Sequence, residues 1–401
     1  MNKFKLKILF LFLFPLIIFP QQKFDIELVE SIPVETTLDN PDIRNTQEVW
    51  LEMINSAQKT LDIEQFYITS EEGEPLDTIL KAIVAAANRG VEVRIIVDAG
   101  FYEMYPADVS RLDAQSYNIE KRVIDFKTLA GGIQHAKFFI VDDEQVFLGS
   151  QNYDWRSLKH IHELGVKIDD EFFSNDLLMI FNADWNYCET HEWNIKRSRI
   201  MLNCVYVNYL EGIWTQYWLL IHPKDYSILN YPDILHLREI FDNTHSEITL
   251  QFLSYNVDYK GEYWGEIEYG LIKAAERGVK IKLIISDWNL GKSAVEHFKY
   301  LITFPNIEIK YTEIPEWSGG YVSFARVEHC KFITADSVCW IGTSNMSKDY
   351  FYNSRNVGVV VENGKFTQRV RDIFYKSWNS NYAHKIEEEG TYKIREHGEI
   401  K

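Results

Sequence analysis

HAKFFIVDDEQVFLGSQN, residues 135–152, is the stretch from which the fold of this chain can be worked out. A second stretch, HCKFITADSVCWIGTSN at residues 329–345, repeats its plan. Each begins with a histidine and a lysine two positions apart and continues into an apolar run. In an extended strand, residues two apart point to the same face, while the residue between them points away. Each His-Lys pair is therefore expected on a strand that is otherwise buried.

Brought together, the two stretches would surround one small anion with imidazoles, ammonium groups and small polar side chains. The candidate residues are His135, Lys137, Ser150 and Asn152 in the first stretch and His329, Lys331, Thr343 and Asn345 in the second. This set suits a phosphate group and a phosphotransfer reaction. A single His-x-Lys would more often belong to a surface strand, so the second copy decides for a site. Asp142 and Asp336 are expected to hold the turns after the strands.

The rest of the chain is also duplicated. Residues 86–91 (AANRGV) are echoed by residues 274–279 (AAERGV), and the two histidines follow at a similar offset. Matches in the same order at a nearly constant offset indicate a repeated unit. By the same alignment Glu163 corresponds to Asn356, so the halves differ in the residue expected to orient a histidine.

Local patterns predict an α/β architecture. Asn45-Thr46-Gln47-Glu48 resembles a capping box that opens a helix. A strand over 60–67, a helix over 76–89 and a strand over 91–97 form a β-α-β unit, which implies parallel strands and helices layered on a sheet. The expected organisation is a segment 1–22, a domain 23–190, a linker or insertion 191–231, a domain 232–386 and a tail 387–401. Each domain should be a mixed sheet flanked by helices, and the two should be related by a pseudo-two-fold axis.

Composition is ordinary for a globular protein of 401 residues, with 46% hydrophobic and 25% charged residues. The net charge of −17 is unusual for a protein that wraps duplex nucleic acid, where a basic surface is expected. The acidity is compatible with a small phosphodiester pocket.

The N-terminus has the pattern of an export signal. Three lysines within the first seven residues precede an apolar run over 8–19. That run is short for a membrane-spanning helix, which needs ~20 residues, but no small-x-small cleavage site follows it. The sequence therefore predicts export, with either a cleaved signal or an uncleaved anchor that associates with the membrane.

No metal or cofactor is expected. The four cysteines show no paired metal spacing. His160 and His162 beside Glu163 could suggest a metal, but alternation along a strand accounts for them. Trp288 and Tyr255 follow strands whose ends should face the site and could stack on bases, although core packing is the more common role of such residues.

The two stretches resemble the paired His-x-Lys-x4-Asp motifs of the phospholipase D superfamily, and the first matches its Gly-Ser-x-Asn extension without a gap. The sequence around them resembles that of the animal endolysosomal phospholipase D-three and D-four branch. The similar segments are LVESIP (28–33), DWRSL (154–158), ELGV (163–166) and IGTSN (341–345). The resemblance spans about residues 24–384. It implies two similar α/β domains with an active site at their interface, and metal-independent phosphodiester cleavage.

The resemblance also implies roles for the residues. One histidine attacks phosphorus and forms a phosphohistidine, and the other protonates the leaving oxygen and then activates water. Family mechanism favours His135 as nucleophile and His329 as acid, with the lysines, hydroxyls and amides stabilising charge on the phosphoryl oxygens. Glu163 is expected to accept a hydrogen bond from the far nitrogen of His135.

Three functions stay open on the sequence. The first is an exported 5′-exonuclease on single-stranded DNA or RNA, and the second is a phospholipase D or transphosphatidylase on glycerophospholipids. The third, a catalytically silent lipid-binding or scaffold protein, is disfavoured because both motifs are intact. A homodimer is a possible assembly.

Overall fold

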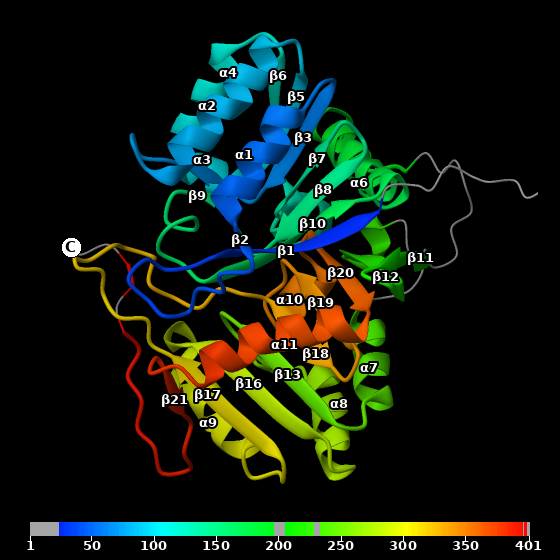
Figure 1. Cartoon of the computed structure of the whole chain (residues 1–401). Helices are drawn as coiled ribbons and strands as arrows, with labels where there is room; N and C mark the ends of the chain where they lie inside the picture. The colour runs from blue at the N-terminus through cyan, green and yellow to red at the C-terminus, as the bar shows by residue number, and fades with distance from the viewer. Residues whose placement is uncertain (1–23, 196–204, 228–232, 396, 399–401) are drawn as a thin grey trace, which may run out of the picture.

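The protein folds as two similar halves that lie one above the other (Figure 1). The structure is a computed structural model and describes residues 24–195, 205–227, 233–395 and 397–398. Within those residues, each half contains one large mixed sheet, with eight strands in the first half and nine in the second. The expected α/β fold with two related halves is confirmed.

The first sheet combines parallel and antiparallel neighbours. Its strand order is β2 (Arg44–Asn45), β1 (Asp25–Ser31), β10 (Glu163–Asp169), β8 (Gln145–Gly149), β7 (Phe138–Val141), β3 (Thr60–Gln65), β5 (Glu92–Asp98) and β6 (Ile119–Ile124). The strands β3, β5 and β6 run parallel, as the β-α-β pattern predicts, and the rest of the sheet from β3 to β1 is antiparallel. The helices of this half are α1 (Thr46–Ser56), α2 (Pro75–Asn88), α3 (Ala99–Met104), α4 (Ala107–Gln115), α5 (Phe126–Ala130) and α6 (Glu171–Thr190).

The second sheet has the same plan. Its strand order is β11 (Val205–Leu210), β12 (Ile213–His222), β20 (Asn356–Glu362), β19 (Val338–Gly342), β18 (Phe332–Ala335), β13 (Glu247–Phe252), β16 (Lys280–Ser286), β17 (Ile307–Thr312) and β21 (Ala383–Lys385). The helices are α7 (Asp233–Asn243), α8 (Glu266–Glu276), α9 (Lys292–Leu301), α10 (Lys348–Tyr352) and α11 (Gly364–Trp378). Short pieces complete the chain: β4 (Ile68–Thr69), β9 (Tyr153–Asp154), β14 (Asp258–Tyr259), β15 (Glu262–Tyr263) and the single turns η1 (Lys224–Tyr226) and η2 (Asp287–Asn289).

The apolar strands are buried on both faces, which is why the sequence around each motif is continuously hydrophobic. In β7, Phe139 and Val141 join an outer core with α1, α2 and α4. Phe138 and Ile140 point the other way, into a central core that also contains side chains of α6, α11 and the second sheet. A third core lies under α7, α8 and α9. The two halves therefore share one hydrophobic core, and this core holds the two motifs in fixed relation.

Strands β11 and β12 correct one expectation. We predicted 191–231 as a linker or insertion without a counterpart in the first half, but β12 pairs with β20 as β1 pairs with β10. The segment 205–222 is therefore part of the second sheet, and β12 occupies the place that β1 has in the first.

The motif residues themselves sit just before the strands on which we predicted them. β7 begins at Phe138 and β18 at Phe332, so each His-x-Lys lies in the three residues before its strand. We call these segments, 135–137 and 329–331, the lead-ins. The lead-ins continue the ladder by one hydrogen bond each, because Gly149 N donates to Lys137 O (3.2 Å) and Gly342 N donates to Lys331 O (3.1 Å). The face alternation expected of a strand is retained.

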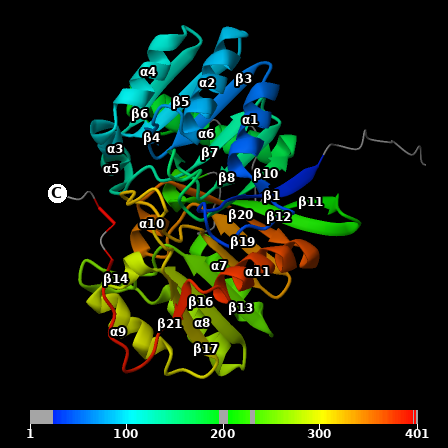
Figure 2. The ribbon, with the colours of Figure 1, turned by 60° about the vertical axis from the view of Figure 1, so that its left-hand side comes forward.

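The ends of the chain differ in what the structure describes. Residues 1–22, where we expect an export signal or anchor, lie outside the described residues. Figure 2 shows the C-terminal tail running along the second half and up to the junction of the halves. Arg395 in this tail pairs with Asp287 at 3.1 Å.

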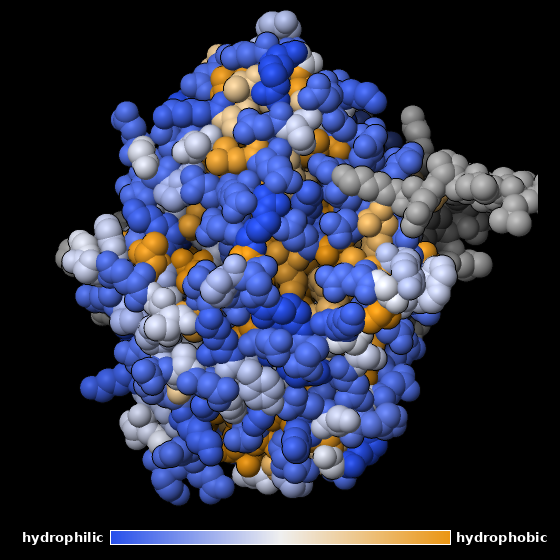
Figure 3. Space-filling view, in the orientation of Figure 1, coloured by the Kyte–Doolittle hydropathy of each residue, from blue (hydrophilic) through white to orange (hydrophobic). Residues whose placement is uncertain are grey.

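The face of the molecule seen in Figure 3 is mostly hydrophilic, with separate hydrophobic patches at several levels, including the junction of the halves. Across the described ranges, we find no helix that combines the length and the apolar character needed to cross a bilayer.

Candidate active site

The two motifs are joined to each other by backbone hydrogen bonds between the halves. His135 N donates to Arg355 O, and Arg355 N donates back to Ile133 O, both at 2.9 Å. The same arrangement recurs on the other side, where His329 N donates to His162 O (2.9 Å) and His162 N donates to Val327 O (3.1 Å). Each His-x-Lys lead-in therefore pairs with the segment that precedes β10 or β20 of the opposite half. The structure thus brings His135 and His329 to one interface.

Each histidine takes its side-chain partner from the opposite half, which corrects our expectation for Glu163. Glu163 Oε2 accepts a hydrogen bond from His329 Nδ1 at 2.7 Å, and not from His135. His135 Nδ1 lies 3.0 Å from Asn356 Oδ1. The correspondence of Glu163 with Asn356 holds, but the pairing with the histidines is exchanged, because the segments cross the pseudo-two-fold axis.

The orientation of the Asn356 amide is fixed by its other contacts. Its Nδ2 donates to Tyr350 O (3.0 Å), and its Oδ1 accepts from Thr343 Oγ1 (2.9 Å). The oxygen therefore faces His135, and it can only accept, so Nδ1 of that ring must carry the hydrogen. The lone pair of His135 is left on Nε2.

Glu163 is held in the same manner by a residue that sequence reasoning missed. Ser157 Oγ donates to Glu163 Oε1 at 2.7 Å, while Oε2 receives His329. Ser157 belongs to the DWRSL segment quoted above, and it occupies the place that Tyr350 has opposite Asn356 in the second half. A hydroxyl six residues before an orienting carboxylate was the available signal.

The two lysines lie beneath the histidines. Lys137 Nζ donates to His135 O at 2.6 Å, and Lys331 Nζ donates to His329 O at 2.7 Å. Both are fully buried. Burial lowers the pKa of Lys137 well below its ordinary value and that of Lys331 to about 8. A phosphodiester anion bound beside these two side chains would favour their charged form.

The hydroxyls and amides of the predicted set divide into two roles. Ser150 Oγ accepts from Leu164 N (3.0 Å), and Thr343 Oγ1 bonds Asn356 as well as the backbone of Val357, so these hydroxyls hold β10, β20 and the histidine partner. The Oδ1 atoms of Asn152 and Asn345 are buried without a hydrogen-bond partner among the described residues. These oxygens can only accept, so a contact of Asn152 or Asn345 with an oxygen of the substrate would have to come from the Nδ2 group.

The two aspartates that complete the motifs hold turns, as predicted. Asp142 accepts hydrogen bonds from the backbone of Gln58, Lys59 and Thr60, which lead into β3. Asp336 does the same for residues 245–247 before β13. Both adopt positive φ, 54° and 48°, as turn residues that close a hairpin do.

The histidine pKa values are set by burial and by charged groups of both halves. Burial lowers the pKa of His135 well below 6.5, and Lys137 and Lys331 lower it further. Burial also lowers the pKa of His329, but the Glu163 carboxylate acts in the opposite direction. The site therefore contains one imidazole held neutral and one whose charged form has a carboxylate partner.

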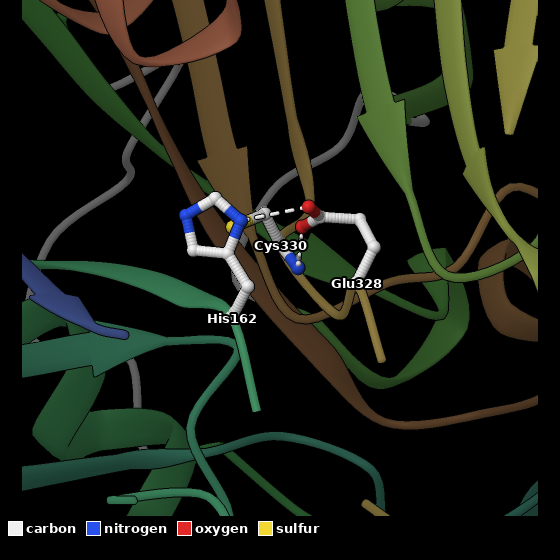
Figure 4. A group of neighbouring side chains, drawn as sticks. All are labelled: His162, Glu328 and Cys330. Carbon is white, nitrogen blue, oxygen red and sulfur yellow. Dashed lines mark hydrogen bonds and ion pairs between the residues drawn. The ribbon is translucent and has the colours of Figure 1, made fainter. Parts of the chain in front are cut away.

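His162 and Glu328, which directly precede Glu163 and His329 in the sequence, form a buried acid-base pair (Figure 4). His162 Nδ1 bonds Glu328 Oε2 at 2.7 Å, and Cys330 N donates to Glu328 Oε1 at 3.0 Å. The ligand atoms of these three residues lie within 4.8 Å of one another, so their chemistry would suit a metal ion. A metal would have to replace the hydrogen bond that joins the imidazole to the carboxylate.

The cluster His160-x-His162-Glu163 is dispersed among different partners. His160 packs against the rings of Trp155 and Trp317, whereas His162 bonds Glu328 and Glu163 bonds His329. The interpretation that these residues do not form one metal site agrees with those contacts.

The aromatic candidates Trp288 and Tyr255 are engaged elsewhere. Tyr255 is buried in the core under α7, α8 and α9. Trp288 packs against His397 of the C-terminal tail, with ring centroids 4.8 Å apart. Neither is presented to the two histidines as a free ring.

Comparisons with known proteins agree with this geometry. The family model described as "Cardiolipin synthase, PLD-like domain" matches residues 50–185 and 239–378, one segment in each half. The chain is 29% identical over 385 residues to Phospholipase D Z of Dictyostelium discoideum, covering 89% of this chain and 90% of the relative. It is also 29% identical over 408 residues to 5'-3' exonuclease PLD3 of Xenopus laevis, covering 89% of this chain and 80% of the relative.

Among solved structures, phosphatidylserine synthase of Haemophilus influenzae superposes with a TM-score of 0.57 at 12% identity, covering 84% of this chain and 85% of that one. This likeness concerns the fold alone. The family model matches more than half of the chain, on both sides of an interface that unites its two motifs. The chain therefore belongs to the phospholipase D-like family and is a phosphodiesterase of that superfamily.

Proposed function

We propose that the protein cleaves phosphodiesters through a phosphohistidine on His135, and that its substrate is single-stranded nucleic acid. The observation that carries the mechanism is the exchange of partners, which gives His135 a neutral amide and His329 a carboxylate. This difference separates the two roles that the reaction needs.

His135 is suited to attack. Asn356 holds the hydrogen on Nδ1, so the Nε2 lone pair is available to form the bond to phosphorus. The low pKa of this ring keeps it unprotonated in mild acid. As the nitrogen–phosphorus bond forms, the bond from phosphorus to the leaving oxygen breaks.

His329 is suited to proton transfer. In its charged form it donates the Nε2 proton to the leaving oxygen, while Glu163 stabilises the imidazolium through Nδ1. The neutral ring then takes a proton from water, the hydroxide attacks phosphorus, and the bond to His135 breaks. Lys137 and Lys331 balance the charge on the phosphoryl oxygens throughout.

Single-stranded nucleic acid is supported by the relative named as a 5'-3' exonuclease, which this chain matches over most of its length. The net charge of −17 argues against broad contact with a duplex and favours a substrate held mainly at the site. The second candidate is a phospholipid, because the relative named Phospholipase D Z is equally similar.

A substrate panel tests the choice. Purified protein should shorten single-stranded DNA or RNA with a free 5′ end, while duplex DNA and phosphatidyl lipids should be turned over more slowly. His329→Ala and His135→Ala should each lower the rate by at least ~10³-fold. Intact oligonucleotide together with release of lipid head groups would assign the phospholipase function instead.

The phosphohistidine has its own test. Rapid quenching of wild-type protein with substrate should give a phosphate adduct on His135 by mass spectrometry, and His135→Ala should give none. An adduct on His329 would exchange the two roles.

We also propose that the chain is exported, since three lysines precede the apolar run over 8–19. Fractionation of expressing cells, with N-terminal sequencing of the recovered protein, distinguishes a cleaved signal from an anchor. Recovery from the cytosol with the first residues intact would contradict export.

A further inference from the structure

Four aromatic side chains gather beside His135 in the first half. This aromatic wall consists of Phe66, Tyr67, Phe101 and Tyr105. The Phe66 ring lies 5.0 Å from the His135 ring and 5.0 Å from Lys137 Nζ, so the wall begins at the reacting groups. Phe66 is buried, whereas Tyr67, Phe101 and Tyr105 are partly exposed.

The three partly exposed rings pack against one another, with Tyr67 stacked on Phe101 and Tyr105 tilted against both. Tyr67 and Phe101 have centroids 5.4 Å apart with an angle of 24° between their planes, and Tyr67 and Tyr105 are 5.5 Å apart at 30°. Where one of these rings keeps an exposed face, another planar ring can stack on it with an offset.

The wall is built into fixed positions around the site. Tyr67 OH donates to Asp154 Oδ2 (2.8 Å), and this carboxylate is gripped by Arg156. Asp98 caps α3 by accepting from Phe101 N (3.2 Å), and its other oxygen accepts from Gln134 N (2.8 Å), one residue before His135. The Asp98 carboxylate therefore bonds both the backbone of Phe101 and the backbone next to His135, and fixes their relative positions.

Among the described residues of the second half, the positions equivalent to Phe66, Tyr67 and Phe101 carry no aromatic ring. Strand register places Leu253 and Ser254 where Phe66 and Tyr67 stand, and Asn289 where Phe101 stands. The Asn289 side-chain oxygen accepts a hydrogen bond from Tyr255 N at 2.7 Å. A feature on one side of a pseudo-symmetric site distinguishes the two ends of a substrate.

We propose that the aromatic wall is a nucleobase subsite, on which the base adjoining the scissile phosphate stacks. This inference rests on the proposed nuclease function. A nucleotide carries its planar base one sugar away from its phosphate, which matches a wall that starts at His135 and Lys137. Stacking on aromatic side chains tolerates every base, so the subsite would hold single strands without reading their sequence.

The test combines protein variants with abasic substrates. Phe101→Leu keeps apolar volume but removes the π face, and Tyr117→Ala is the control because Tyr117 is 97% exposed in the same half. The substrates are one single-stranded oligonucleotide and its versions with an abasic residue at each position near the cleaved end. The readout is kcat/KM for each pair.

We expect wild-type protein to lose about 10-fold in kcat/KM when one position next to the cleaved bond is abasic. Phe101→Leu should lose about 10-fold on the intact oligonucleotide and nothing further on that abasic version, and Tyr117→Ala should behave as wild type. Equal losses for Phe101→Leu on both substrates, or no loss on either, would overturn the subsite.

The same experiment separates the inference from the function beneath it. Cleavage without coupling between Phe101 and the base removes the subsite and leaves the nuclease intact. Absence of cleavage by wild-type protein removes both. A loss of phospholipid turnover in Phe101→Leu, with unchanged oligonucleotide cleavage, would assign the wall to a lipid chain and contradict the proposal.

Discussion

At the scale of single residues, the site depends on which atom each histidine offers. Asn356 and Glu163 occupy equivalent places in the two halves, yet one is neutral and the other charged. A duplicated site thereby becomes chemically asymmetric without any change in the histidines or lysines. The asymmetry should be visible in the dependence of kcat/KM on pH.

Glu163→Gln tests the acid. The pKa of His329 lies below 6.5 because burial outweighs the carboxylate, and removing the negative charge lowers it further. The rate should therefore begin to fall at a lower pH than in wild type, with a loss of at least ~10-fold at the wild-type optimum. A pH–rate profile whose alkaline limb stays in place would separate Glu163 from proton transfer.

Asn356→Asp tests the nucleophile. A carboxylate opposite Nδ1 stabilises the charged ring and raises the pKa of His135, which burial now holds well below 6.5. A protonated imidazole cannot attack, so activity should decline in acid where wild type is still active, and recover as pH rises. An unchanged acidic limb would show that His135 is not the group that must be neutral.

Sequence reasoning predicted nine site residues but paired one of them, Glu163, with the wrong histidine, for a physical reason. Aligning the halves shows that Glu163 and Asn356 are equivalent. That alignment does not show whether each of them bonds the histidine of its own half or the histidine of the opposite half. Only the crossing of the segments at His162 and Arg355 decides between these arrangements, and that crossing is a contact between distant parts of the chain.

At the scale of elements, the pattern of helices and strands was predictable where the sequence is periodic or capped. The helix after Asn45 begins at Thr46, and the Asn45 side chain accepts from Gln47 N as a cap should. Strand β12 was missed because its sequence has little in common with that of β1, and their equivalence is seen in how they pair with β20 and β10.

The turn aspartates offer a test at this scale. Asp142→Ala removes the acceptor for three backbone N–H groups before β3 and leaves alanine at a φ of 54°. We expect a loss of about 2–3 kcal/mol in the free energy of unfolding with kcat nearly unchanged. Asp142→Asn keeps an acceptor and tolerates positive φ, so its loss should be smaller. A large fall in kcat at unchanged stability would give Asp142 a chemical role.

At the scale of the whole molecule, two further buried ion pairs join the halves besides His329 with Glu163, and they differ in chemistry. Arg355 bonds Asp184 through two nitrogens, at 2.7 and 2.8 Å, and the equivalent position in the first half is His162, which bonds Glu328. Arginine keeps its charge at every relevant pH, whereas histidine does not. Of these two ion pairs, the one between His162 and Glu328 is therefore sensitive to pH.

The direction of that sensitivity follows from the pKa values of the pair. Burial opposes the charge on His162, but Glu328 outweighs it and raises the pKa above 6.5. Burial likewise opposes the charge on Glu328, and His162 outweighs it and lowers that pKa below 4.5. The stabilisation is therefore fully present between about pH 4.5 and 6.5. It is lost as pH rises through the pKa of His162, or falls through that of Glu328.

His162→Ala should cost about 3–5 kcal/mol at pH 6, because it leaves a buried carboxylate without its partner. The double variant His162→Gln with Glu328→Gln keeps a neutral pair of similar volume and should cost less. Urea unfolding at pH 6 and pH 9 checks the mechanism: wild type should lose stability at the higher pH, and the double variant should lack that part of the loss. If both proteins lose the same amount, the pH dependence arises elsewhere, and the interface is held equally at both pH values.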